Sequence, residues 1–92
     1  MSDRLLFVSM NCPHCRKYIG IVEDINMKLA PDKQIERINI NGFDTRIQKY
    51  IWYIKKYGTP FFVMDGYAII GMTTEKFVRG FLNAYLKKAG DL

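Results

Sequence analysis

The sequence predicts one α/β domain over residues 1–92, in which a four-stranded mixed sheet carries helices on both faces. Two continuous apolar runs, residues 5–8 within a predicted strand at 5–9 and residues 61–64, are typical of strands that are buried on both faces. Stretches with helical spacing separate the first three predicted strands, and a hairpin signal separates the last two. With 92 residues, 49% of them hydrophobic, the chain can bury one core but is too short for two domains.

The first helix is predicted to begin at Pro13, soon after the strand at residues 5–9. Proline suits the first helical position, where its missing N–H would have no partner within the helix. Pro31 is expected to end the helix, because the residue before a proline disfavours the helical region. Apolar residues recur every three or four positions between these prolines. They are Cys15, Tyr18, Ile19, Val22, Ile25 and Leu29.

The middle of the chain predicts a second strand and a second helix. Alternation over residues 35–40 gives the strand signal, and Asn41-Gly42 ends it. Asp44 or Thr45 can cap one helix that continues to Gly58, where a left-handed glycine stops it. The buried stripe of this helix is expected to contain Ile47, Tyr50, Ile51 and Ile54.

A hairpin and a last helix complete the predicted order of strand, helix, strand, helix, strand, strand, helix. Asp65-Gly66 favours a type I′ turn, so the strands at residues 61–64 and 67–70 should be antiparallel. The first two strands should be parallel through a right-handed crossover. Thr73 or Thr74 can cap the last helix. Its apolar stripe is expected to contain Phe77, Val78, Phe81, Leu82 and Tyr85.

Both cysteines lie in one motif, Cys12-Pro13-His14-Cys15, at the start of the first predicted helix. Residues three apart on a helix face the same side, so the two thiols can form a disulfide. Unpaired N–H groups and the helix dipole favour a negative sulfur on Cys12, whereas Cys15 lies one turn further in and should be shielded. We therefore expect Cys12 to be the nucleophile and Cys15 the resolving thiol of a redox-active disulfide.

The motif also admits other interpretations. The cysteines could be inert core residues, or could hold a metal ion or an iron–sulfur cluster that a second chain completes. His14 lies between the cysteines and should point elsewhere, so the sequence predicts no metal site within one chain. His14 could be exposed without a role, or its positive charge could stabilise the Cys12 thiolate and make the disulfide more oxidising.

Composition and charge narrow the class of partner. The formal net charge of +5 favours a basic surface, which could serve solubility alone or could attract an anionic partner such as glutathione or an acidic protein surface. Because no basic run is interleaved with aromatic residues, we expect no nucleic-acid partner. The chain has no apolar run long enough to cross a bilayer and no signal-peptide pattern, so we expect no membrane partner and a cytoplasmic location. There, a Cys-x-x-Cys pair is more often redox-active or metal-binding than structural.

The cysteine motif after a first strand, together with Thr59-Pro60 before a third, resembles the glutaredoxin branch of the thioredoxin superfamily. The resemblance covers nearly the whole chain and implies a thioredoxin fold of the glutaredoxin type. It also implies that a cis peptide bond precedes Pro60, which would face the cysteines, and that the Thr59 backbone pairs with a bound thiol peptide. The implied partners are protein disulfides, with glutathione as a candidate cosubstrate. The resemblance also implies a monomeric protein with no cofactor beyond the Cys12–Cys15 disulfide.

Several positions depart from the glutaredoxin pattern. Many glutaredoxins have tyrosine in place of His14, and Pro-His between the cysteines looks like the bacterial oxidases that introduce disulfides. The lysine that usually precedes the first cysteine is absent from Ser9-Met10-Asn11. Arg46 and Lys49 remain candidates for the glycyl carboxylate of glutathione.

Thr73 and Thr74 are candidates for the γ-glutamyl end of glutathione, through their hydroxyls and the start of the last helix. The predicted function is a dithiol–disulfide oxidoreductase that reduces protein or glutathione mixed disulfides. The alternatives are a protein disulfide oxidase or isomerase, and a module that binds an iron–sulfur cluster or metal.

Overall fold

A computed structural model describes residues 3–71 and 74–92 and confirms the predicted order of elements. No helix in this part of the chain is long and apolar enough to cross a membrane. The strands are β1 (Arg4–Val8), β2 (Glu36–Asn39), β3 (Phe61–Met64) and β4 (Tyr67–Ile69). The helices are α1 (Pro13–Asn26), α2 (Thr45–Lys49), α3 (Ile51–Tyr57) and α4 (Glu75–Lys88), with a short 3₁₀ helix, η1 (Pro31–Lys33).

β1 and β3 are the central strands of one mixed sheet with the order β2-β1-β3-β4. As predicted, β1 is parallel to β2, and β3 and β4 form an antiparallel hairpin; β1 also pairs antiparallel with β3. The hairpin turns at Asp65 and Gly66, whose φ values of 53° and 84° are both positive, as a type I′ turn requires. The central position explains the continuous apolar runs, because both faces of β1 and β3 are covered.

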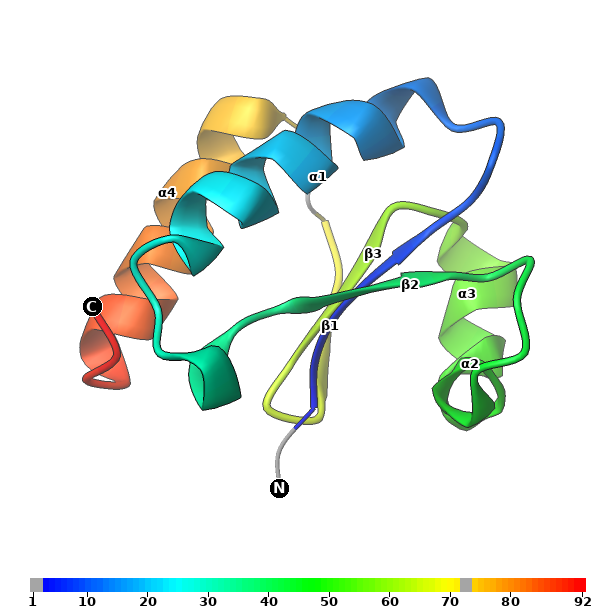
Figure 1. Ribbon diagram of the computed structural model, residues 1–92. Helices are drawn as coiled ribbons and strands as arrows, with labels where there is room; N and C mark the ends of the chain where they lie inside the picture. Colours follow the sequence, from blue (N-terminus) through cyan, green and yellow to red (C-terminus); the bar gives the residue numbers. More distant parts are fainter. Residues whose placement is uncertain (1–2, 72–73) are drawn as a thin grey trace.

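Helices cover both faces of the sheet, as predicted (Figure 1). α1 and α4 pack on one face, and α2 and α3 pack on the other. Successive residues of β1 alternate between the two cores: Leu6 and Val8 face α1 and α4, whereas Leu5 and Phe7 face α2 and α3. Packing on both faces fixes the position of the end of β1, from which residues 9–12 lead into α1.

The predicted second helix is interrupted at Tyr50, so the expectation of one continuous helix is wrong. Tyr50 has φ −113° and ψ 14° and separates α2 from α3. Its ring is buried with its centroid 5.8 Å from that of Phe7, and its hydroxyl donates a hydrogen bond to Asp3 over 2.8 Å. The backbone departs from helical geometry at the residue that these contacts hold in the core. The predicted cap and stop are confirmed: Asp44 accepts a hydrogen bond from the Arg46 N–H, and Gly58 ends α3 at a φ of 74°.

The buried face of α4 is rotated relative to the predicted stripe. Val78, Leu82 and Leu86 are buried, whereas Phe77 is 52% exposed. Phe77, Phe81 and Tyr85 therefore form a row of stacked rings beside the core. The ring centroids of Phe77 and Phe81 are 6.5 Å apart, and those of Phe81 and Tyr85 are 6.1 Å apart. Thr74 caps the helix by accepting a hydrogen bond from the Phe77 N–H over 3.2 Å, as predicted; Thr73 lies outside the described residues.

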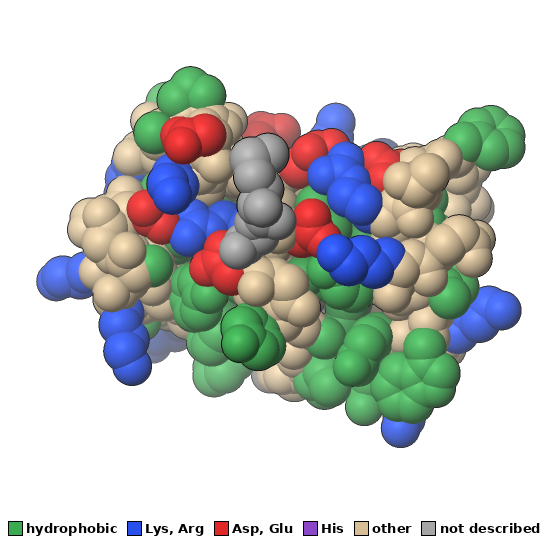
Figure 2. All heavy atoms as spheres, turned by 90° about the horizontal axis from the view of Figure 1, so that it is seen from below, with side chains coloured by type: hydrophobic (Ala, Val, Ile, Leu, Met, Phe, Trp, Pro, Cys, Tyr) green, Lys and Arg blue, Asp and Glu red, His purple; other side chains and the backbone are tan. Residues whose placement is uncertain are grey.

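Charged side chains of both signs gather at the end of the sheet where β1 begins (Figure 2). Asp3 binds Lys49 over 3.0 Å, and Arg46 pairs with both Glu36 and Asp44. These ion pairs connect the start of β1 and β2 to α2. They lie at the surface, so each contributes little to stability by itself.

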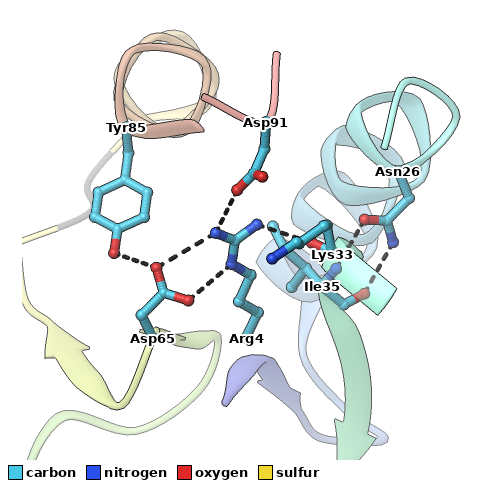
Figure 3. A network of polar contacts seen from close by, with 7 residues as sticks. All are labelled: Arg4, Asn26, Lys33, Ile35, Asp65, Tyr85 and Asp91. Atoms are coloured by element: carbon cyan, nitrogen blue, oxygen red, sulfur yellow. Dashed lines mark hydrogen bonds and ion pairs between the residues drawn. The ribbon is translucent and has the colours of Figure 1, made fainter. Parts of the chain in front are cut away.

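A nearly buried arginine links the start of β1 to the hairpin and to the C-terminal end of the chain (Figure 3). The Arg4 side chain is 9% exposed; its Nε lies 2.9 Å from Asp65 Oδ1 and its Nη2 lies 2.6 Å from Asp91 Oδ2. Its Nη1 donates to the Lys33 carbonyl, and the Tyr85 hydroxyl donates to Asp65 over 2.6 Å. The Arg4 guanidinium lowers the pKa of the Asp65 carboxyl, and burial raises the pKa of Tyr85 to about 12.

α1 ends at Asn26, so the end predicted from Pro31 is several residues too late. The Asn26 side chain binds the backbone of Ile35 twice: Nδ2 donates to the carbonyl over 2.8 Å, and Oδ1 accepts from the N–H over 2.9 Å (Figure 3). Gln34 Nε2 donates to the Asn26 carbonyl over 3.1 Å. These bonds satisfy polar groups at the helix end and tie them to the chain entering β2.

We expect Asp65→Asn to lower the free energy of unfolding at pH 7 by about 2 kcal/mol, because Arg4 keeps Asp91 but loses the other of its two carboxylate partners in a partly buried site. The folded-state pKa of Asp65 is lowered, so its contribution is present above the ordinary value of 3.8 and is lost as the pH falls through the lower folded value. The difference in the free energy of unfolding between the wild type and Asp65→Asn should therefore be smaller at pH 3 than at pH 7. Urea unfolding of both proteins at the two pH values measures this difference.

The matched control is Asp24→Asn, which removes an exposed ion pair with Arg79. It should cost less than about 1 kcal/mol at either pH. A loss for Asp65→Asn that is as small as the control's, or that does not change with pH, would contradict the importance of the Arg4 network.

Candidate active site

The two cysteines lie at the start of α1, at the sheet edge where the parallel strands β1 and β2 end. Cys12 occupies the N-cap position with an extended backbone, and Pro13 is the first helical residue, as predicted. The Cys12 Sγ accepts a hydrogen bond from the Cys15 N–H over 3.2 Å. A sulfur in this position receives one of the unpaired N–H groups of the first helical turn, which favours its negatively charged form.

Cys12 and Cys15 form a disulfide across one turn, with their Cα atoms 5.2 Å apart. Cys15 is 2% exposed and belongs to the core beneath α1 and α4. Cys12 is half-buried at the margin of this core. Of the two sulfurs, that of Cys12 is therefore the more accessible to a reactant from outside, while Cys15 is close enough to react with it.

Thr59 lies beside Cys12 on the β3 side of β1. The Cys12 Sγ is 3.7 Å from the Thr59 carbonyl oxygen, a contact rather than a hydrogen bond, because a disulfide sulfur carries no proton to donate. The β1–β3 register, with Phe7 opposite Phe61, brings Ser9 opposite Thr59, and their hydroxyls share a hydrogen bond of 2.8 Å. The peptide bond between Thr59 and Pro60 is cis, as the resemblance implies.

A cavity of about 460 Å³ opens on the other side of Cys12, between α1 and β2. Both cysteines line it, together with Arg16 of α1 and Arg37 of β2. Both arginines are exposed, and within residues 3–71 and 74–92 neither forms an ion pair. The cavity therefore places two positive charges, without counter-charges, beside the reactive sulfurs.

Arg37 is a site residue that the sequence did not single out. In the β1–β2 register it lies opposite Leu6, and Asn39 lies opposite Val8. Because Leu6 and Val8 face α1, Arg37 and Asn39 face the same side and reach the cavity. The alternation within β2 is visible in the sequence, but it does not say which of the two sets faces α1.

His14 is exposed on the first turn of α1. No hydrogen bond or ion pair joins it to any other residue that the structure describes. Its imidazole is thus available to solvent or to a substrate, and it makes no intramolecular contribution to a ligand cluster.

The structure does not bring Arg46 and Lys49 to the cysteines. Arg46 is held by Glu36, which lies opposite Leu5 near the start of β1, and Lys49 is held by Asp3. The Arg46 guanidinium also lowers the pKa of Asp44 to about 2. Both cations are paired and lie toward the far end of the sheet, so this geometry gives no support to the prediction that they contact glutathione.

Thr74 lies at the start of α4, which approaches the early part of α1: Lys17 Nζ is 3.6 Å from Glu75 Oε1. Its hydroxyl is occupied as the helix cap, and the structure does not describe Thr73. Over the described ranges, no group of three or more His, Cys, Asp or Glu side chains is placed to hold a metal ion.

No protein-family model matches the sequence, and no curated protein matches it either. Functional inference for this chain therefore depends on the geometry around Cys12 and Cys15.

We expect iodoacetamide to alkylate Cys12 of the reduced protein about ten times faster than Cys15 at pH 7, because Cys12 is only half-buried and its sulfur accepts a hydrogen bond at the helix start, whereas Cys15 is buried. Peptide mapping by mass spectrometry after partial alkylation measures both rates. Cys15→Ser should retain the fast reaction and Cys12→Ser should lose it. Faster modification of Cys15 would reverse the assigned roles.

Proposed function

We propose that the protein is a glutaredoxin-like dithiol–disulfide oxidoreductase of the thioredoxin superfamily, which reduces protein disulfides or glutathione mixed disulfides. The observation that carries this proposal is the asymmetry of the disulfide. Cys12 is half-buried and accepts a hydrogen bond at the helix start, whereas Cys15 is buried one turn away. The four-stranded mixed sheet with helices on both faces is compatible with a thioredoxin-like fold.

In the proposed reaction, the Cys12 thiolate attacks one sulfur of a substrate disulfide. A bond forms between Cys12 and that sulfur as the substrate disulfide breaks, and the departing thiolate takes a proton from solvent. The Cys15 thiol then loses its proton to solvent and attacks the Cys12 sulfur, which forms the Cys12–Cys15 disulfide and releases the second substrate thiolate. Two electrons pass to the substrate, and an external thiol such as glutathione returns them.

Thr59 is suited to orient an extended substrate at Cys12. Its carbonyl oxygen lies 3.7 Å from the Cys12 sulfur, and it precedes the first β3 residue that pairs with β1, Phe61. An extended chain whose cysteine reacts with Cys12 can offer a backbone N–H to this carbonyl, in the manner of an added strand. We place this activity in the cytoplasm, where the glutathione pool can supply the reducing thiol.

Cys12→Ser should lower turnover by about a thousandfold or more with every disulfide substrate, because no attacking sulfur remains. Cys15→Ser should still reduce a small glutathione mixed disulfide but lose most activity on insulin, because the mixed disulfide with a protein has no resolving thiol. Glutathione-coupled consumption of NADPH and insulin turbidity measure the two activities. Full activity of Cys12→Ser would overturn the proposal.

A protein disulfide oxidase is the second candidate, and His14 is the residue that favours it. His14 is exposed within the cysteine motif, where its protonated form adds positive charge beside Cys12. Such a charge stabilises the reduced thiolate form and so makes the disulfide more oxidising. A reduction potential near about −120 mV would favour the oxidase, and one between about −200 and −270 mV would favour the reductase.

We expect His14→Tyr to make the potential of the Cys12–Cys15 couple more negative by about 30 mV, which corresponds to a tenfold change in the equilibrium constant. Equilibration with glutathione buffers, followed by thiol trapping, measures the potential. A value that does not change would remove His14 from the redox chemistry without affecting the roles of the cysteines.

A further inference from the structure

We propose that Arg16 and Arg37 form a carboxylate-binding subsite beside Cys12, which favours disulfide substrates that carry a carboxylate close to the reacting sulfur. The inference rests on the proposed function and names the substrate class of the same site.

The cavity lined by the two arginines is large enough for a small ligand group and lies next to the Cys12 sulfur. Its volume of about 460 Å³ is within the range of pockets that hold small ligands. Arg16 enters it from the first turns of α1, and Arg37 enters it from β2, so two elements that are independent in sequence converge there. Cys12 is part of the same wall, which makes the cavity adjacent to the point of reaction.

The state of the charges indicates what the cavity binds. The chain's other arginines, Arg4, Arg46 and Arg79, each pair with a carboxylate. In the described part of the chain Arg16 and Arg37 have no such partner, although both line one cavity. The planar guanidinium matches the geometry of a carboxylate, and two unpaired cations in one hollow repel each other until an anion lies between them.

No described acidic side chain of the protein fills this role. None lines the cavity, and the carboxylate of Glu75 at the start of α4 pairs with Lys17 of α1. Glu23 lines a neighbouring hollow that includes Arg37, yet it forms no ion pair with it. A carboxylate from a ligand can therefore enter the cavity without competing with an acidic side chain of the protein.

The sheet topology explains how a substrate reaches the arginines while it is bonded to Cys12. β1 lies between β2 and β3, so the cavity and Thr59 lie on opposite sides of the Cys12 sulfur. A substrate chain that contacts the Thr59 carbonyl extends across the sulfur toward β2. A carboxylate next to the substrate's cysteine, from an acidic side chain or from glutathione, then faces Arg16 and Arg37.

The test compares two capped peptide disulfides that differ only in whether glutamate or glutamine flanks the cysteine, with glutathione disulfide as a third substrate. For the wild-type protein we expect KM to be about fivefold lower with glutamate than with glutamine. Arg37→Gln and Arg16→Gln should each reduce this preference, mainly by raising KM for the glutamate peptide. The preference is the ratio between the two peptides in one variant, so a general change in the reactivity of Cys12 does not alter it. High salt should weaken the preference in the wild type.

Arg79→Gln is the matched control, because it removes the same charge from an exposed arginine on α4 that pairs with Asp24. It should keep the preference. A raised KM for glutathione disulfide in Arg37→Gln would identify glutathione as one source of the carboxylate, and an effect confined to the glutamate peptide would identify a polypeptide source. An equal loss with all three substrates would overturn the subsite, since it would indicate a general effect on the sulfur.

A binding measurement separates failure of the subsite from failure of the proposed function. A cysteine-free glutamate peptide should shift the side-chain NMR signals of Arg16 and Arg37 in the oxidised protein, and its glutamine counterpart should not. If the wild type reduces none of the disulfides, the proposed function fails, but these shifts would still support carboxylate binding. Absence of the shifts would overturn the subsite even if the protein reduces disulfides.

Discussion

The pairing of β1 with strands on both of its edges is the constraint on which the candidate site depends. β2 holds β1 on one edge in parallel register, and β3 holds it on the other in antiparallel register. Two separate cores cover its faces, so the strand cannot slide or rotate without exposing apolar side chains. Its end therefore lies between the end of β2 and the start of β3, and the short connection to α1 carries Cys12 between Arg37 and Thr59.

The two ends of the sheet differ in whether their basic side chains are paired with carboxylates. Where β1 begins, Arg4, Arg46 and Lys49 are all paired with carboxylates, and these contacts join the strands, α2 and the C-terminal end of the chain. Where β1 ends, Arg16 and Arg37 have no ion pair among the described residues. Paired charges connect separate segments at one end of the domain, and unpaired charges leave the other end able to attract an anion. The proposed chemistry lies at the second end.

Local chemistry explains which features of the fold were predictable. Pro13 begins α1 because proline lacks only an N–H that the first turn does not use, and Asp65-Gly66 turns the hairpin because both residues tolerate positive φ. Element boundaries that depend on distant contacts were less predictable. α1 ends where Asn26 binds Ile35, and the second helix breaks where Tyr50 reaches Asp3 and Phe7. Neither partner can be identified from helical spacing.

The candidate site also combines features that local sequence predicts with features that depend on distant contacts. The spacing of Cys12 and Cys15, at a helix start marked by Pro13, was enough to predict the disulfide and to predict that Cys12 is the more exposed cysteine. Both predictions depend only on the local geometry of the first helical turn. Arg37 enters the site, and Arg46 and Lys49 do not, because of strand register and of ion pairs between segments far apart in the chain. Side-chain alternation reveals two faces of a strand, but only its packing against α1 determines which face meets the sulfurs.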